Sequence, residues 1–220
     1  MKKPSEEKLK LEIERLNKMR EYENKYPEYI IAGVDEAGRG PLAGPVVAGC
    51  VVLPKDIDIL FLNDSKKLSE KKREELFIEI KEKALAYGIG IVSEKIIDEI
   101  NILEATHLAM KEAIKNAQDM FLKKYNKKFD LIFVDAISSG KPDIKKVDIK
   151  QVSLAHGDAL SLSIAAASIM AKVTRDHMMI EYDKKYPEYG FDKHKGYGTK
   201  LHYESIKKYG MCEIHRKTFV

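Results

Sequence analysis

Five apolar segments of strand length, and the way they are joined, most constrain the fold of this 220-residue chain. The first two, residues 29–35 and 46–53, are separated only by a short turn rich in glycine and proline, which predicts an antiparallel pair. The other three lie at residues 87–92, 130–135 and 149–154, and helical patterns separate most of them. Strands joined through helices pair in parallel. The order therefore predicts an α/β fold with one mixed five-stranded sheet flanked by helices.

Segments with the apolar spacing of an amphipathic helix surround these strands. Helices are expected over residues 5–26, 69 to about 84, 101 to about 123 and 158 to about 184, with short helices and loops from residue 186 onward. No Gly/Ser linker or internal repeat divides the chain. We therefore expect one domain in three parts: a helical N-terminal extension at 1–28, a core at 29–186, and a small, basic, helical C-terminal appendage at 187–220.

Composition limits the cellular setting. No run of 18 apolar residues occurs, and the charged N-terminus lacks the apolar stretch of a secretory signal. Cys50 and Cys212 are the two cysteines and form no C-x-x-C pair, so neither a zinc site nor a disulfide framework is indicated. We therefore expect a cytoplasmic protein with no membrane contact.

The small net positive charge is concentrated near the C-terminus. Residues 172–220 hold 11 Lys/Arg and 7 Asp/Glu, and 11 − 7 = +4 is the net charge of the whole chain. Four of the six histidines also lie there. Such a segment is typical of contact with a polyanion, but an ordinary solvated surface explains the charge equally well.

The first candidate site is the pair Asp35-Glu36, which follows the first apolar strand. Adjacent side chains of a strand point to opposite faces, so the two carboxylates converge only if the backbone bends there. The glycines that follow favour such a bend, and a divalent cation would relieve the repulsion. The alternative is a solvated acidic pair in a loop.

Two more acids also lie at an end of a predicted strand or helix. Asp135 ends a strand, where it could instead cap a turn, and Asp158 precedes the last long helix, where it could instead be an N-cap. Together with Asp35 and Glu36 they predict a four-carboxylate site for two-metal phosphoryl transfer, if the ends of these elements meet.

The pattern Gly38-x-Gly40-x-x-Ala43 after the first strand nearly matches a dinucleotide-binding fingerprint. A strand follows it instead of a helix, and two carboxylates at its mouth would repel a pyrophosphate, so we reject that interpretation. A glycine loop with an arginine is better suited to close approach of a polynucleotide backbone.

Six segments together resemble the ribonuclease HII family, the type 2 ribonucleases H. They are Ile31–Val47, Asn63–Leu68, Val134-Asp135, Gly157-Asp158, Ala166–Asp176 and His194–His202. The resemblance extends from about Tyr29 to Phe219 and implies an RNase H-like fold. It also implies a monomeric endonuclease, dependent on Mn²⁺ or Mg²⁺, that cleaves RNA in RNA–DNA hybrids and incises 5′ of single ribonucleotides embedded in duplex DNA.

The resemblance also implies roles for individual residues. It makes the four acids catalytic metal ligands, and it assigns recognition of the ribose 2′-hydroxyl and adjacent phosphates to Gly38, Arg39 and Gly40. It assigns sensing of the RNA–DNA junction to Tyr197. The candidate phosphate contacts are Ser65, Lys66, Lys67, Lys172 and Arg175.

Two other functions remain open from the residues. A junction-resolving nuclease of the same fold class also uses clustered carboxylates, but it has no need to sense a 2′-hydroxyl. A non-catalytic hybrid-binding module would gain nothing from four converging acids, which weaken phosphate binding without a metal.

Overall fold

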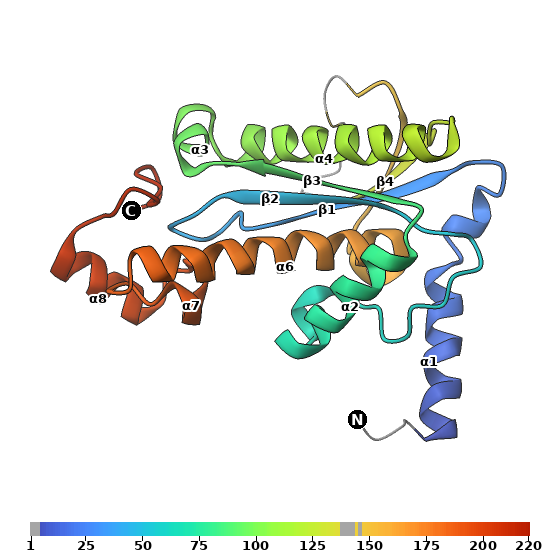
Figure 1. Ribbon diagram of the computed structural model, residues 1–220, viewed down its shortest axis with the longest axis horizontal. Helices are drawn as coiled ribbons and strands as arrows, with labels where there is room; N and C mark the ends of the chain where they lie inside the picture. The colour runs from blue at the N-terminus through green and yellow to red at the C-terminus, as the bar shows by residue number, and fades with distance from the viewer. Residues whose placement is uncertain (1–4, 137–143, 145–146) are drawn as a thin grey trace.

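A computed structural model describes residues 5–136, 144 and 147–220, and it contains one five-stranded mixed sheet in the order β3-β2-β1-β4-β5 (Figure 1). The strands are β1 (Ile31–Ala37), β2 (Val46–Val52), β3 (Ala86–Val92), β4 (Leu131–Asp135) and β5 (Lys150–Leu154). β1 pairs antiparallel with β2 and parallel with β4, β2 pairs antiparallel with β3, and β4 pairs parallel with β5. The predicted fold class is therefore confirmed.

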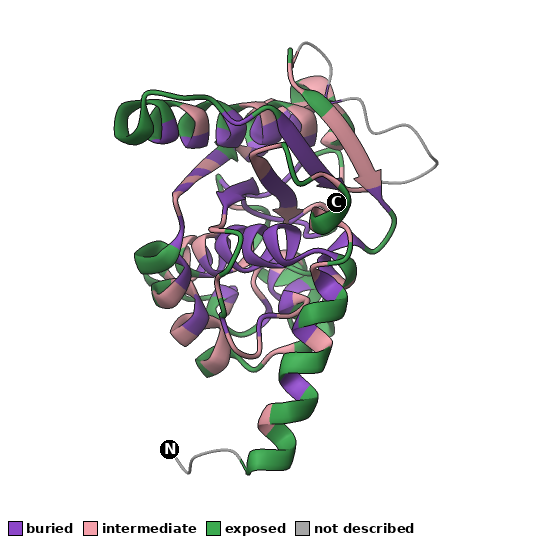
Figure 2. Cartoon of the chain, turned by 90° about the vertical axis from the view of Figure 1, so that its right-hand side faces the viewer, coloured by how far each residue is buried: buried purple, intermediate pink, exposed green. Residues whose placement is uncertain are grey.

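Two long helices cover the two faces of the sheet. One face packs on α4 (Ile102–Tyr125) with the short α3 (Glu94–Ile100) beside it. The other face packs on α6 (Leu162–Lys185), which α2 (Glu70–Lys83) and α1 (Glu6–Met19) flank. α6 is buried along most of its length, whereas α1 is largely exposed (Figure 2). A three-layer arrangement of this kind leaves the ends of the strands as the places where polar side chains can gather.

Glycines in the strands allow both long helices to lie unusually close to the sheet. A Cβ on Gly33 would lie 2.0 Å from the backbone carbon of Ser163 in α6, and one on Gly90 would lie 1.9 Å from the carbonyl oxygen of Ala109 in α4. Backbone cannot yield to such an overlap as a side chain can. The strand glycines therefore fix how closely the helices approach.

Two helices differ from the sequence-based expectation. The predicted helix over residues 5–26 ends at Met19, and a separate 3-10 turn, η1 (Glu23–Lys25), follows it. The predicted helix from residue 158 is interrupted, because Ser161 is extended and caps α6 with its side chain. The residues before this break form the short helix α5 (Gly157–Leu160), so Asp158 does not cap the long helix.

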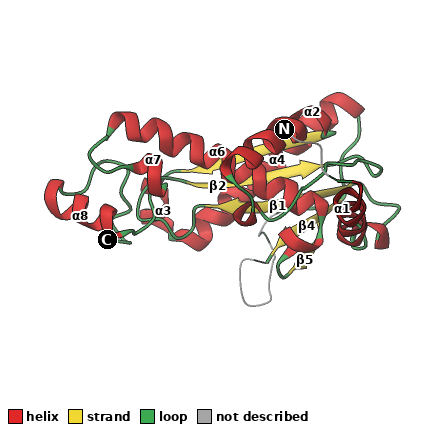
Figure 3. Cartoon of the chain, turned by 90° about the horizontal axis from the view of Figure 1, so that it is seen from below, coloured by secondary structure: helices red, strands yellow, loops and turns green. Residues whose placement is uncertain are grey.

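The C-terminal part of the chain lies against one end of the sheet, with α1 at the other end (Figure 3). It contains α7 (Phe191–His194) and α8 (Lys200–Tyr209). A small separate core joins it to α6 and to the β1–β2 turn, and Met179, Phe191 and Ile214 are buried there. An isolated bridge between Ala43 and His215 completes the contact. The C-terminal segment thus packs against the β1–β2 turn at Ala43, while Gly40 of the same turn stays exposed.

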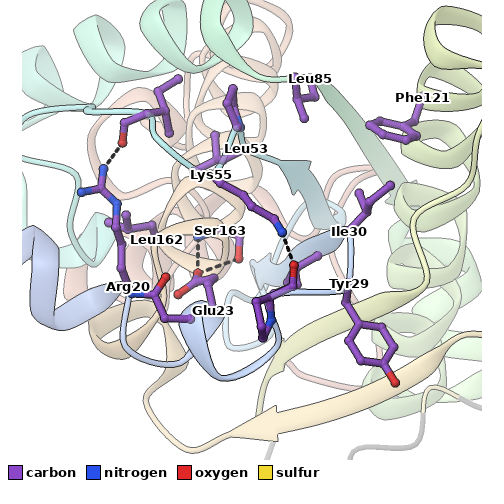
Figure 4. A pocket seen from close by; sticks show the side chains of 15 residues that line it. Arg20, Glu23, Tyr29, Ile30, Leu53, Lys55, Leu85, Phe121, Leu162 and Ser163 are labelled. Carbon is purple, nitrogen blue, oxygen red and sulfur yellow. Dashed lines mark hydrogen bonds between the residues drawn. The ribbon is translucent and has the colours of Figure 1, made fainter.

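An apolar cavity of about 380 Å³ lies at the opposite end of β1 from its acidic residues (Figure 4). Its wall includes Ile30, Leu53 and Phe121. Of its polar groups, Glu23 Oε1 accepts hydrogen bonds from Ser163, whereas Glu23 Oε2 and Arg20 Nε are buried without a hydrogen-bond partner among the described residues. Its position and lining separate it from the carboxylates described below. No helix in the described part of the chain is both long and apolar enough to cross a membrane.

We predict that Gly33→Ala destabilises the fold, because the added methyl group meets the backbone of α6 at 2.0 Å. Overpacking of this kind costs about 1–3 kcal/mol of unfolding free energy. Gly157→Ala is the matched control, since the nearest atom to its new methyl group is the flexible end of Ile164, at 2.6 Å. Urea unfolding measures both variants, and equal stability losses would contradict the close-packing argument.

Candidate active site

The parallel pairing of β1 with β4 brings two acids together at the C-terminal ends of these neighbouring strands. Gly33 pairs with Phe133 and Val34 with Val134, so the next residues, Asp35 and Asp135, end up side by side. Their side chains lie on the α6 face, because they have the same parity as Gly33, which contacts α6. Asp35 is only 4% exposed, so the strand delivers a carboxylate into the interior of the protein.

The third acid comes from the connection between β5 and α6. Asp158 lies in α5, where it is buried, and the backbone N–H of the adjacent Gly157 donates to Asp135 Oδ1 at 2.8 Å. One carboxylate oxygen each from Asp35, Asp135 and Asp158 lies within 4.8 Å of the others. The structure therefore unites three of the four predicted acids in one cluster.

Burial and mutual repulsion make these carboxylates hard to ionise. Burial raises the pKa of Asp35 well above its usual range, and the charges of Glu36 and Asp135 add to the effect. Burial also raises the pKa of Asp135, and it raises that of Asp158 to about 6, with a contribution from Asp64. A nearby cation would reverse these costs. The cluster is therefore a set of oxygen ligands of the kind that Mg²⁺ and Mn²⁺ prefer.

Glu36 lies beside the cluster, and the predicted bend before it is absent. β1 continues regularly through Ala37, which pairs with Val47, so Glu36 faces the opposite side of the strand from Asp35. Its Oε1 lies 3.6 Å from Nη1 of Arg39. Burial raises the pKa of Glu36, while Arg39 acts in the opposite direction. The expectation of convergence through a bend was wrong, although Glu36 remains close enough for its charge to act on Asp35.

Two side chains that the sequence reasoning did not single out also reach the cluster. Ser168, in the small-residue segment of α6, hydrogen-bonds to Asp35, and its Oγ lies 2.9 Å from Ser65 Oγ. Asp64 lies beside Asp158, and in addition to burial, its negative charge and a hydrogen bond that it accepts from the protonated Asp158 carboxyl raise the pKa of Asp158. Asp64 could have been suspected from the sequence, because it precedes Ser65 in the Asn63–Leu68 segment. Only the tertiary structure shows that this loop lies beside the acids.

The loop of residues 63–68 also brings positive charge to the acids. Burial alone would lower the pKa of Lys66, but the surrounding carboxylates, Asp35 first among them, raise it above its usual range. Lys66 and Lys67 are exposed, so both ammonium groups are accessible to a phosphate. Ser65 is buried, and its hydroxyl is 2.9 Å from that of Ser168, so its side chain supports the loop from within.

The glycine–arginine loop and Tyr197 lie next to each other. A Cβ on Gly40 would lie 3.9 Å from Tyr197 Cε1, an ordinary contact distance. Tyr197 is 45% exposed, while its backbone N–H donates to the His194 carbonyl and its own carbonyl accepts from His202 Nδ1. The phenol ring is therefore accessible to solvent on a backbone that is firmly held.

Arg175 is not available as a phosphate contact. It is 1% exposed, and its guanidinium donates to the backbone carbonyls of Pro45, Lys195 and Ala43 at 2.9, 2.9 and 3.0 Å. The family resemblance suggested Arg175 as a phosphate contact, but the sequence did not show that its side chain is buried. Lys172 is also partly buried, and its Nζ donates to Asp176 Oδ1 at 2.7 Å. The structure therefore uses both predicted phosphate contacts within the protein.

A family model and individual relatives of this chain both indicate the ribonuclease HII family. The family model described as Ribonuclease HII matches residues 32–220. A Ribonuclease HII from Ruminiclostridium cellulolyticum is 56% identical over 212 residues, which covers 95% of this chain and 78% of that protein.

Solved structures agree with this assignment. The ribonuclease H2 of Pyrococcus horikoshii OT3 is 33% identical with a TM-score of 0.64, and the match covers 86% of this chain and 92% of that one. Bst-RNase HIII, solved in complex with Mn²⁺, shares the fold with a TM-score of 0.67 at 16% identity, over 86% of this chain and 67% of its own. The sequence matches, together with the acidic cluster at the end of β1 and β4, show that this chain belongs to the ribonuclease HII family of endoribonucleases.

Proposed function

We propose that this endoribonuclease cleaves the RNA strand of RNA–DNA hybrids and incises 5′ of a single ribonucleotide embedded in duplex DNA. We also propose that it does so by two-metal hydrolysis with Mg²⁺ or Mn²⁺. The observation that carries the proposal is the cluster of Asp35, Asp135 and Asp158, whose oxygens lie within 4.8 Å of one another. Buried carboxylates so close together are costly without a cation, and two-metal sites for phosphoryl transfer use this ligand type.

The residues of the site divide the chemical work. Divalent ions bound there would supply an activated water and stabilise the leaving 3′-oxygen. Asp35, Asp135 and Asp158 would hold these ions, with Glu36 at the edge of the set. Lys66 already interacts electrostatically with the acids and would meet the adjacent phosphate.

Selection of RNA requires groups that sense the ribose 2′-hydroxyl, which both donates and accepts hydrogen bonds. The loop of residues 38–40 lies within contact distance of Tyr197 and is anchored through its carbonyl groups, those of Gly38 and Arg39. Its amides would therefore meet the 2′-hydroxyl. The exposed ring of Tyr197 would stack on the next sugar, where a second 2′-hydroxyl would collide with it.

We predict that Asp35→Asn lowers the cleavage rate on a DNA duplex with one ribonucleotide by on the order of 10³-fold, because it removes a shared metal ligand. The fold should be retained in circular dichroism, since the change also relieves repulsion. Asp119→Asn, an exposed acid on α4, is the matched control and should leave the rate unchanged. The wild type should lose activity with a chelator. Near-normal turnover of the Asp35 variant in Mg²⁺ would place the metal site elsewhere, and cleavage of an all-DNA four-way junction would favour a junction-resolving nuclease.

We predict that Asp158→Asn stabilises the metal-free protein at about pH 7.5 but not at about pH 4.5. The pKa of Asp158 is about 6 in the folded protein, above its ordinary value of 3.8. The folded state therefore binds this proton more tightly than the unfolded state, and the resulting stability is lost as the pH rises through about 6. Thermal unfolding in a chelator measures the effect. Mn²⁺ should then stabilise the wild type more than the variant, and a pH-independent difference between the two would contradict the acid cluster.

We predict that Tyr197→Ala reduces cleavage at a single embedded ribonucleotide by roughly 5- to 150-fold, since stacking of an aromatic ring is worth about 1–3 kcal/mol. Cleavage of an all-RNA hybrid should fall less, so the ratio of the two rates is the measurement. Tyr125→Ala, a partly exposed tyrosine at the end of α4, is the control. An unchanged ratio in Tyr197→Ala would place junction sensing in the Gly38–Gly40 loop.

A further inference from the structure

Two fully buried arginines lie behind the loops that would meet the substrate. Arg175, in α6, is 1% exposed, and Arg216, near the C-terminus, is 0% exposed. Within the described part of the chain, no carboxylate forms a salt bridge with either guanidinium. Burying an unpaired charge is expensive unless its donors are satisfied, so the partners of these groups indicate what they do.

Arg216 binds the glycine–arginine loop through its backbone. Its three nitrogens donate to the carbonyl oxygens of Gly38 (2.6 Å), Gly44 (2.9 Å) and Arg39 (3.0 Å). Its own N–H donates to the Leu42 carbonyl at 2.8 Å. One side chain near the C-terminus thus fixes a loop 177 positions away in the sequence.

Arg175 joins the same loop to the turn that carries Tyr197. Its nitrogens donate to the carbonyls of Ala43 and Pro45 on one side and to that of Lys195 on the other. It also forms the surface on which Gly38 rests, because a Cβ on Gly38 would lie 2.1 Å from Arg175 Nε. Its side chain is therefore a spacer between the two loops.

Six carbonyl groups accept the hydrogen bonds of the two guanidinium groups, and in the described part of the chain no carboxylate forms a salt bridge with them. Burial lowers the pKa of Arg175 to about 10 and that of Arg216 to about 9, so both remain protonated at neutral pH. A planar guanidinium with five donors can hold several carbonyls in a fixed relative geometry, whereas an ammonium group cannot. An apolar core would fill the same space but would leave these carbonyls unsatisfied.

We propose that Arg175 and Arg216 form a positioning clamp, which sets the spacing between the Gly38–Gly40 loop and Tyr197 and so sets selectivity for a ribonucleotide followed by DNA. The proposal rests on the function proposed above, because it assigns those two loops to one substrate. The arginines themselves touch no reacting atom. Their effect would be transmitted through the loops that they hold.

The test uses Arg175→Lys and Arg216→Lys, each of which leaves the other arginine and its three hydrogen bonds in place. We expect kcat/KM for a single embedded ribonucleotide to fall by about 10- to 100-fold, the usual effect of a small misplacement of binding groups. Cleavage of an all-RNA hybrid, which contains no RNA–DNA junction, should fall less. Mn²⁺ affinity, measured by calorimetry, should stay unchanged, because the acid cluster is not altered.

A second readout does not depend on activity. The chain contains no tryptophan, so Tyr197→Trp introduces a single fluorescent reporter into the turn. In this background, Arg175→Lys should lower the fluorescence anisotropy and increase quenching by acrylamide, since the turn loses its link to Lys195. This result would support the clamp even if the enzyme proved to have a different substrate, so the two proposals can fail separately.

Met110→Ala is the control for a general loss of stability, because it truncates a buried side chain of α4 on the opposite face of the sheet. It should lower Tm but change neither the rate ratio nor the anisotropy. Folded lysine variants with an unchanged rate ratio and unchanged anisotropy would overturn the proposal. Unfolding of both lysine variants would also overturn it, because it would assign the arginines to stability alone.

Discussion

The parallel pairing of β1 with β4 is the constraint on which the site depends. It places Asp35 next to Asp135 at the C-terminal ends of the two strands, with both side chains directed toward α6. The close approach of α6 to Gly33 then lets Ser168 reach Asp35. A one-residue slip in this register would turn one of the two carboxylates to the other face. The acidic cluster is therefore a consequence of strand register, and the remaining loops are arranged around it.

The protein holds two kinds of buried charge, and it treats them differently. The negative cluster is left without full compensation, since the pKa values of Asp35, Asp135 and Asp158 are all raised. The positive groups, Arg175 and Arg216, are surrounded by six backbone carbonyls instead. Carboxylates whose negative charge is not fully compensated can attract a cation. Guanidinium groups whose hydrogen bonds are all made to the backbone can instead hold the surrounding loops in place. Loops fixed in this way can present an exposed ring such as Tyr197 without losing its orientation.

Local patterns in the sequence predicted the mixed sheet and named four candidate acids, three of which cluster, because strand length, turn length and acids at the ends of elements are all local signals. They failed where tertiary contacts decide. Glu36 faces away from Asp35 because pairing with β2 keeps the strand regular through Ala37, which no local residue reveals. Arg175 has the sequence appearance of a surface cation and becomes buried only because the loop of residues 43–45 folds over it. Asp64 reaches Asp158 across a long-range contact that the spacing of motifs does not encode.

The proposed function requires that Asp35, Asp135 and Asp158 hold divalent cations in the active enzyme. The most direct test is a crystal structure of the wild-type protein soaked in Mn²⁺, with the ions located by anomalous scattering at the manganese absorption edge. We expect anomalous density within coordination distance of all three carboxylates, about 2.0–2.4 Å from their oxygens, and none at this position in Asp35→Asn. A fully occupied manganese site elsewhere, with the three carboxylates empty and bound only to protein groups or water, would contradict it.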